Sequence, residues 1–152
     1  MFIVIDGIDW SWKYTQIKEL EKELIKRKKT VKLLDFPRYD NQSTYMIQKY
    51  LNLGYKKNIS SKQISLLFAL DRFDASDGIS KDLDKYDYVI SNRYTSSNLI
   101  HHLSKIDKFK QEEFIKWVLD FEYNILKVPK PDITIVLLVS PNISKELIKK
   151  KK

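Results

Sequence analysis

The chain has 152 residues, 43% of them apolar, a formal charge of +8 and no cysteine. These values suit one domain, residues 1–152, and they argue against global disorder, disulfide bonds and cysteine-based metal sites. No apolar stretch approaches the roughly 20 residues that span a bilayer, and the start, MFIVIDGID, lacks the features of a secretory signal, so we expect a cytoplasmic protein without a membrane partner.

Short apolar runs alternate along the chain with stretches of helical periodicity. The first pattern predicts strands at residues 2–5, 30–35, 86–92 and 132–140. The second predicts helices at residues 15–29, 60–82 and 114–125, with a lysine-rich helix after Pro141. This alternation favours an α/β fold, in which helices cover both faces of a parallel sheet and ligands bind at the carboxyl ends of the strands.

The segment GIDWSWKYTQ, residues 7–16, follows the first predicted strand and partly matches a phosphate-binding loop, G-x-x-x-x-G-K-[ST]. Gly7 and Lys13 have the required spacing, and a helix follows. Trp12 stands at the second glycine and Tyr14 at the short hydroxyl residue, so the loop pattern alone is not met.

Four further segments follow in order: DFPRYD (35–40), LLFALDRFDA (66–75), VISNRYTSSNLIHH (89–102) and VPKPDITIVLLVSP (128–141). With the loop, they resemble the thymidylate kinase family, whose members transfer the γ-phosphate of ATP to dTMP. The resemblance covers residues 1–141 and implies a three-layer sandwich of the P-loop nucleoside-monophosphate kinase type. It also implies Mg²⁺ with ATP as cofactor, and ATP and dTMP as ligands.

The resemblance implies a phosphate site at the first loop. Gly7, Ser11, Lys13 and Thr15 are expected around the ATP phosphates, and Asp9 near the dTMP phosphate and sugar. Asp9 is also the weak candidate for a metal ligand. By itself, an Asp before a helix is as readily a turn or cap residue.

The resemblance also implies a dTMP site. Its expected members are Phe36 and Arg38 after the second strand, Phe68 and Arg72 on one helix, and Arg93, Asn98 and His101 after the third strand. Phe68 is expected on the thymine face, Arg72 and Asn98 on the base edge, and Arg93 on a phosphate. Taken singly, each has a plainer interpretation, as a core phenylalanine, a surface arginine or a surface histidine.

Three departures from the family pattern concern activity. Trp10, Trp12 and Tyr14 crowd the loop, where glycine permits positive φ and close approach to phosphate, so we expect weak ATP binding. Asn92 replaces an acidic residue near the metal. The chain ends at ISKELIKKKK, where family members continue into an arginine-rich lid, a last strand and a last helix, so we expect a C-terminally truncated fold with the 133–139 strand as an open edge.

Three interpretations remain at this point. The chain is an active thymidylate kinase in dTTP biosynthesis, or an inactive paralogue or fragment that keeps the nucleotide pocket, with a homodimer possible in either case. A basic nucleic-acid-binding module rests on the net charge alone, and the frequent lysines also fit a biased overall composition. We therefore expect no nucleic-acid partner.

Overall fold

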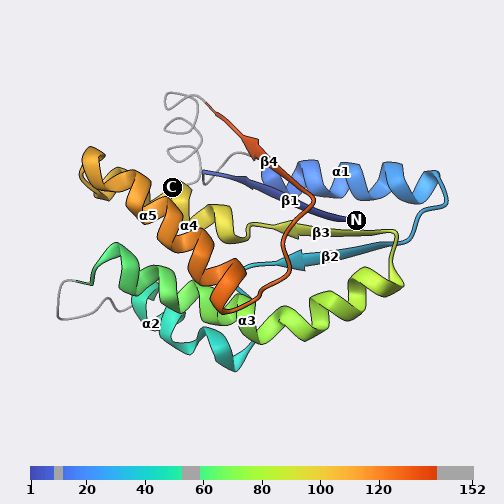
Figure 1. Cartoon of the computed structure of the whole chain (residues 1–152). Helices are drawn as coiled ribbons and strands as arrows, with labels where there is room; N and C mark the ends of the chain where they lie inside the picture. The colour runs from blue at the N-terminus through green and yellow to red at the C-terminus, as the bar shows by residue number, and fades with distance from the viewer. Residues whose placement is uncertain (9–11, 53–58, 140–152) are drawn as a thin grey trace.

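The computed structural model describes residues 1–8, 12–52 and 59–139, in which strands and helices alternate (Figure 1). The strands are β1 (Phe2–Gly7), β2 (Val31–Asp35), β3 (Tyr88–Asn92) and β4 (Ile133–Leu137). The α-helices are α1 (Lys13–Lys26), α2 (Tyr45–Asn52), α3 (Ser61–Lys85), α4 (Thr95–His102) and α5 (Lys108–Asp120). Short helical segments are η1 (Gln42–Thr44), η2 (Leu103–Lys105) and the π-helical η3 (Phe121–Ile125).

The strands form one sheet in the order β2-β3-β1-β4, and every pair in it is parallel. The predicted α/β class with a parallel sheet is thereby confirmed. The register places Asp35, at the end of β2, opposite Asn92, at the end of β3. Asn92 also pairs with Ile5 of β1, so the carboxyl ends of three strands meet at one edge of the sheet.

Each face of the sheet has its own apolar cluster, and this makes three layers. Towards α1, Ile17 packs on the buried strand residues Ile3, Ile5 and Ile90. Towards α3, the cluster is Phe2, Val4, Phe36, Ala75, Ile79, Val89, Tyr94 and Val128. Figure 1 shows α1 along one face and α3, α4 and α5 on the other. The expected three-layer sandwich is therefore present in the described residues.

The predicted strands all occur, and the helix boundaries shift. The first helix begins at Lys13 instead of Thr15, and α3 begins after Ser60, whose side chain accepts from the Gln63 backbone N–H in a capping box. Two helices, α2 and α4, were not predicted, because each has only eight residues and a short apolar pattern. The helix expected after Pro141 lies outside the described residues.

Within the described residues, β4 pairs with β1 alone and lies at the end of the sheet, as the sequence led us to expect. Its apolar side chains are largely exposed, with Ile133 at 44%, Val136 at 43% and the following Leu138 at 90%. Among the described helices, none has the length and apolar character needed to cross a membrane.

Candidate active site

The loop between β1 and α1 lies at the edge where three strands end. Asp9, Trp10 and Ser11 fall outside the described residues, so the expectations for Asp9 and Ser11 stay predictions. Trp12 has φ 54° and ψ 23°, the left-handed conformation that the family's glycine at this position would adopt without cost. Its side chain is 54% exposed. The backbone therefore keeps the loop's turn, and a tryptophan carries the strain of that turn.

Lys13, the first residue of α1, points back into this loop. Its side chain is 7% exposed, and Nζ donates to the carbonyl oxygens of Gly7 at 3.0 Å and Ile8 at 2.6 Å. Thr15, in the same first helical turn, is exposed. The ammonium group is therefore at the loop, where a bound phosphate competes with backbone carbonyls for its protons.

Asp6, just before the loop, is buried and joins β1 to α4. Its Oδ1 accepts from the Gly7 N–H at 2.8 Å, and its carboxylate accepts from Ser96 Oγ at 2.7 Å and from Ser97 Oγ at 2.8 and 2.9 Å. The guanidinium of Arg93 lies 3.8 Å from Oδ1. Sequence reasoning gave Asp6 no such role. The acidic residue before the loop is thus used to hold the start of α4 against β1.

Arg93 connects the loop with the segment after β3. It has a φ of 65°, a left-handed conformation that a non-glycine residue keeps only where its surroundings enforce it. Its Nη1 lies 3.4 Å from the Gly7 carbonyl oxygen and 2.6 Å from His101 Nε2. Because a guanidinium only donates, His101 Nε2 is the acceptor here. The structure therefore brings Arg93, Gly7 and His101 together, three residues that the sequence placed among the nucleotide-binding candidates.

A cavity of about 400 Å³ opens beside Arg93. Its wall includes four residues predicted for the dTMP site, Phe68, Arg93, Asn98 and His101. The other lining residues are Pro37, Tyr39, Tyr50, Leu51, Ser97, His102 and Lys105. The ring centroids of Phe68 and His102 lie 6.5 Å apart. An aromatic face, an amide and a guanidinium thus line one cavity, a combination that suits a base at one end and a phosphate at the other.

His102 is buried in this wall, and burial lowers its pKa to about 4, with the charge of Lys105 acting in the same direction. The imidazole is therefore neutral at pH 7. Its Nδ1 has no hydrogen-bond partner in the described structure. A neutral ring beside Phe68 keeps this end of the cavity largely apolar.

Phe36 and Arg38, two other predicted members of the dTMP site, do not line the cavity. Phe36 is 4% exposed and packs in the core, with its ring centroid 5.4 Å from that of Tyr94. Arg38 Nε donates to Asp71 Oδ1 at 2.9 Å, and Nη2 donates to Asp74 Oδ2 at 2.6 Å. Two carboxylates of α3 therefore hold the guanidinium against that helix.

Arg72 is also away from the cavity wall, although Phe68 on the same helix lines it. Its side chain is 2% exposed, and it donates to both oxygens of Glu122, from Nε and from Nη2, each at 2.6 Å. The sequence led us to expect Arg72 on the base edge or on the surface, and the described structure has it in a buried ion pair. Glu122 is the partner that sequence reasoning missed.

Asn92 occupies the place of the family's acidic residue, and a carboxylate lies next to it. Asn92 Nδ2 donates to Asp35 Oδ1 at 2.9 Å across the paired ends of β2 and β3. Partial burial raises the pKa of Asp35, while the Asn92 bond and the charges of Arg93 and Lys13 oppose that rise. Asp35 and Asn92 also line a small cavity of about 220 Å³ with Tyr14. The negative charge missing from position 92 is thus present one strand away.

Within the described residues, no group of three or more Asp, Glu and His side chains gathers to hold a metal ion. Magnesium at nucleotide sites is held by one or two carboxylates together with substrate phosphates and water. Asp35, at the strand ends beside the charges of Lys13 and Arg93, fits that requirement.

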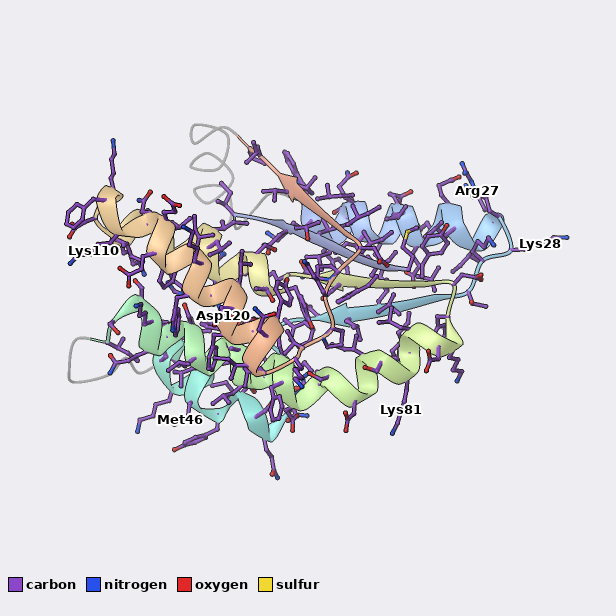
Figure 2. The ribbon with its side chains drawn as sticks, in the orientation of Figure 1. Arg27, Lys28, Met46, Lys81, Lys110 and Asp120 are labelled. Carbon is purple, nitrogen blue, oxygen red and sulfur yellow. The ribbon has the colours of Figure 1, made fainter. Side chains whose placement is uncertain are left out.

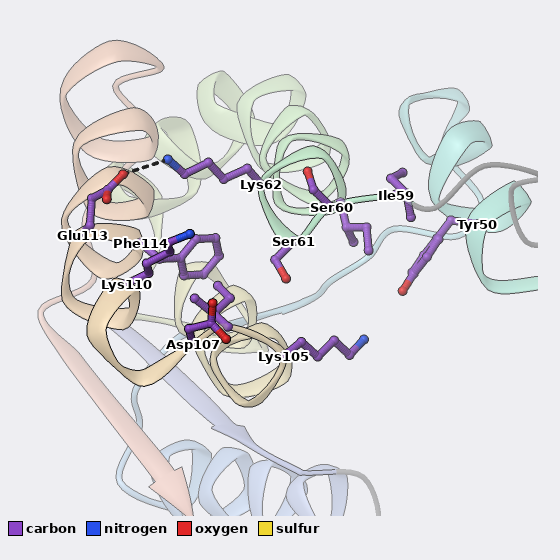
Figure 3. A pocket seen from close by; sticks show the side chains of 12 residues that line it. Tyr50, Ile59, Ser60, Ser61, Lys62, Lys105, Asp107, Lys110, Glu113 and Phe114 are labelled. Carbon is purple, nitrogen blue, oxygen red and sulfur yellow. Dashed lines mark hydrogen bonds and ion pairs between the residues drawn. The ribbon is translucent and has the colours of Figure 1, made fainter.

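A larger cavity, of about 700 Å³, lies between the start of α3 and the start of α5 (Figure 3). Lys62 reaches across it to Glu113, with 3.2 Å between Nζ and Oε1. Tyr50 and Lys105 line both this cavity and the smaller one beside Arg93. The predicted site residues that the structure describes do not line it.

The basic side chains labelled in Figure 2 extend from separate parts of the molecule. Lys28 follows α1, Lys81 lies on α3 and Lys110 on α5, and all three are exposed. These labelled side chains therefore do not form one cluster.

The chain is similar to proteins of one known family over nearly its whole length. The family model described as thymidylate kinase matches residues 5–152. The thymidylate kinase of Mycobacterium tuberculosis (strain H37Rv) is 30% identical over 148 residues, which cover 96% of this chain and 69% of that protein. The probable thymidylate kinase of Methanocaldococcus jannaschii is 32% identical over 154 residues, which cover 99% and 71%.

Among solved structures, that of a thymidylate kinase from Candida albicans is similar to this chain, with a TM-score of 0.75 and 27% sequence identity. The match covers 99% of this chain and 67% of that one. The chain therefore spans about two thirds of the length of these proteins.

Proposed function

We propose that this chain, which belongs to the thymidylate kinase family of nucleoside monophosphate kinases, transfers the γ-phosphoryl group of ATP to dTMP and releases dTDP. The observation that carries the proposal is the place of Arg93. Its guanidinium lies at the Gly7 carbonyl of the phosphate loop, and it also lines the cavity with Phe68 and Asn98. A phosphate bound by Arg93 is therefore next to both the ATP loop and a base-sized pocket.

Phosphoryl transfer depends mainly on position and charge, because the protein takes little covalent part in it. In this proposal Lys13 lies along the β- and γ-phosphates and gives up its bonds to the Gly7 and Ile8 carbonyls. Arg93 binds the dTMP phosphate in line with the γ-phosphate. Phe68 contacts the face of the thymine, and Asn98 bonds its edge. His101 accepts from Arg93 and orients the guanidinium.

Magnesium enters this proposal together with ATP. When bound, it neutralises charge on the phosphate oxygens. Asp35 is the described carboxylate that fits it best, and the hydrogen bond from Asn92 orients that carboxylate. Asp9, the weak metal candidate from the sequence, stays a prediction.

A second candidate is a protein that binds dTMP without turnover. The left-handed backbone at Trp12 favours this candidate, because the loop is already strained. The bonds from Lys13 to two loop carbonyls favour it too, because ATP binding has to break them. This candidate and the active kinase share the dTMP cavity and differ at the ATP loop.

The proposal further includes a cytoplasmic location, no nucleic-acid partner and a homodimer. Leu70 and Phe73 support the homodimer, since they lie three residues apart on α3 and are 49% and 51% exposed. Sedimentation of the chain and of a Leu70→Glu/Phe73→Glu variant tests it. A monomer in both cases contradicts the homodimer and leaves the activity proposal standing.

The direct test is ADP release from Mg·ATP with and without dTMP. We expect release that depends on dTMP, and a loss of about 10²- to 10³-fold in the Arg93→Met variant, since one group that stabilises transition-state charge is removed. The matched control is Arg27→Met. Arg27 is exposed and lies past the carboxyl end of α1, at the opposite end of the molecule from α4 and α5 (Figure 2). No release, with dTMP still bound, supports the second candidate.

A further inference from the structure

Four side chains beside the cavity form one buried network centred on Glu122. Its carboxylate accepts from Arg72 Nε and Nη2 at 2.6 Å each, from Thr95 Oγ1 at 2.8 Å and from Asn98 Nδ2 at 2.9 Å. Arg72, Thr95, Asn98 and Glu122 are each 1–2% exposed. They come from α3, α4 and the π-helical segment η3, so the network fixes three elements at one point.

Among these residues, Asn98 alone lines the cavity of about 400 Å³. Both hydrogen bonds of its side chain are donated by Nδ2, to Glu122 Oε1 at 2.9 Å and to the Ser65 carbonyl oxygen at 3.3 Å. A carboxylate only accepts, so the atom of the amide that faces Glu122 has to be the nitrogen. Oδ1 is then the polar atom of this side chain that remains to accept from a ligand.

The fixed amide has a consequence for the base in the cavity. Thymine and uracil carry an N–H at ring position 3, which can donate to Oδ1. Cytosine has a lone pair at that position, which would face another acceptor and remain unsatisfied. A freely rotating asparagine could turn its Nδ2 to cytosine instead. The short bond from Nδ2 to Glu122, supported by the longer one to the Ser65 carbonyl oxygen, prevents this.

We propose that Glu122 is a positioning residue of the base site, which locks the Asn98 amide so that the cavity selects pyrimidines with an N–H at ring position 3. The inference rests on the proposed function, because it takes the cavity as the acceptor site. Glu122 acts through Asn98 and does not touch the nucleotide.

The test is binding of dUMP and dCMP, measured by calorimetry without ATP. These two nucleotides differ only at positions 3 and 4 of the ring, and neither carries the methyl group of thymine. We expect the wild-type chain to prefer dUMP by about tenfold or more, as one unmatched polar group predicts.

Two variants separate Glu122 from Arg72. Arg72→Met removes the arginine and leaves Glu122 bonded to Asn98, so the preference for dUMP persists. Arg72→Met/Glu122→Met removes the whole ion pair with side chains of similar size, and buried pairs are often replaced in this way without loss of the fold. In the double variant we expect the preference to fall to within about twofold, because Asn98 then keeps only the longer bond to the Ser65 carbonyl oxygen, at 3.3 Å, and its amide can turn more readily.

A double variant that keeps the tenfold preference overturns the inference. Thermal unfolding is recorded for each variant, and if the double variant is not folded, Arg72→Leu/Glu122→Leu takes its place with the same expected decrease in the preference. A preference unchanged in that variant also overturns the inference. A wild-type chain that binds none of dTMP, dUMP and dCMP contradicts the proposed function as well, whereas dTMP binding with a preference independent of Glu122 contradicts only the role of Glu122.

Discussion

The base end of the candidate site is held by a buried hydrogen-bond network, whereas the phosphate end has a strained loop backbone. At the base end, the buried charge of Glu122 is met by four donated hydrogen bonds. At the phosphate end, a tryptophan holds a left-handed backbone, and the loop's lysine is bonded to loop carbonyls. A chain can therefore keep the acceptor half of a kinase site well ordered while the donor half departs from the pattern that ATP requires.

The largest expected effect on stability concerns the buried ion pair at the base end. Glu122→Ala leaves Arg72 as a buried charge without a partner and should lower the free energy of unfolding by about 3–5 kcal/mol. Urea denaturation measures it. The control is Glu112→Ala, because Glu112 pairs with Lys116 on the exposed side of α5. This substitution should lower the free energy of unfolding by no more than about 0.5 kcal/mol. Equal losses in the two variants would show that the network contributes little.

The next effect breaks the phosphate end. Lys13→Met removes the loop's ammonium and should lower kcat/KM for ATP by about 10²- to 10³-fold, with dTMP affinity unchanged. Steady-state kinetics measures kcat/KM for ATP, and calorimetry measures the affinity for dTMP. Lys22→Met is the matched control on the same helix, since Lys22 pairs with Glu19 and both side chains are largely exposed. A parallel fall in dTMP affinity would contradict the division into two halves.

A smaller effect concerns pH and His102. Its pKa is about 4 in the folded chain and about 6.5 when unfolded. As pH falls from about 6.5 to 4, the unfolded chain takes up a proton that the folded chain does not, so stability decreases by at most about 3 kcal/mol. Thermal unfolding across this range measures it. The His102→Asn variant lacks this contribution and keeps the others, including the opposite effect of the raised Asp35 pKa. If the stability of the wild-type chain and of His102→Asn depended on pH in the same way, the predicted contribution of His102 would be wrong.

The smallest expected effect concerns the loop backbone at Trp12. Trp12→Gly relieves the left-handed backbone and should stabilise the fold by about 1 kcal/mol. Lys28→Gly is the matched control, because Lys28 has a φ of 58° just past α1 and lies away from the site. Both variants should raise the midpoint of thermal unfolding, and only Trp12→Gly should tighten ATP binding. If both variants bound ATP more tightly, the gain in affinity would not come from the loop, and the prediction would be wrong.

The sequence predicted the strands and the longer helices because their apolar residues recur with clear periods. It did not predict Glu122, whose burial depends on Arg72, fifty residues away. One signal was present: Phe114, Val118 and Glu122 are four residues apart, which places a carboxylate on the apolar face of that helix. The left-handed backbone at Trp12 was not predicted, because a tryptophan seldom adopts positive φ and its sequence position alone does not reveal it.

Some of the predicted site residues meet at the cavity, and others are held in ion pairs away from it. Arg93, Asn98, Phe68 and His101 come together around the cavity, because they lie on helices and strand ends whose order the sequence specifies. Arg38 and Arg72 are held by Asp71 and Glu122 instead. Which carboxylate an arginine meets depends on tertiary packing, and a single sequence does not report it.

The most direct test of this account is calorimetric binding of dTMP and of Mg·ATP to the chain and to a Trp10→Gly/Trp12→Gly/Tyr14→Ser variant. We expect dTMP to bind both proteins with affinities within about twofold of each other, and ATP to bind the variant at least about tenfold more tightly, which corresponds to about 1.4 kcal/mol. Unchanged ATP affinity in the variant, or no binding of dTMP to the chain itself, would contradict the account.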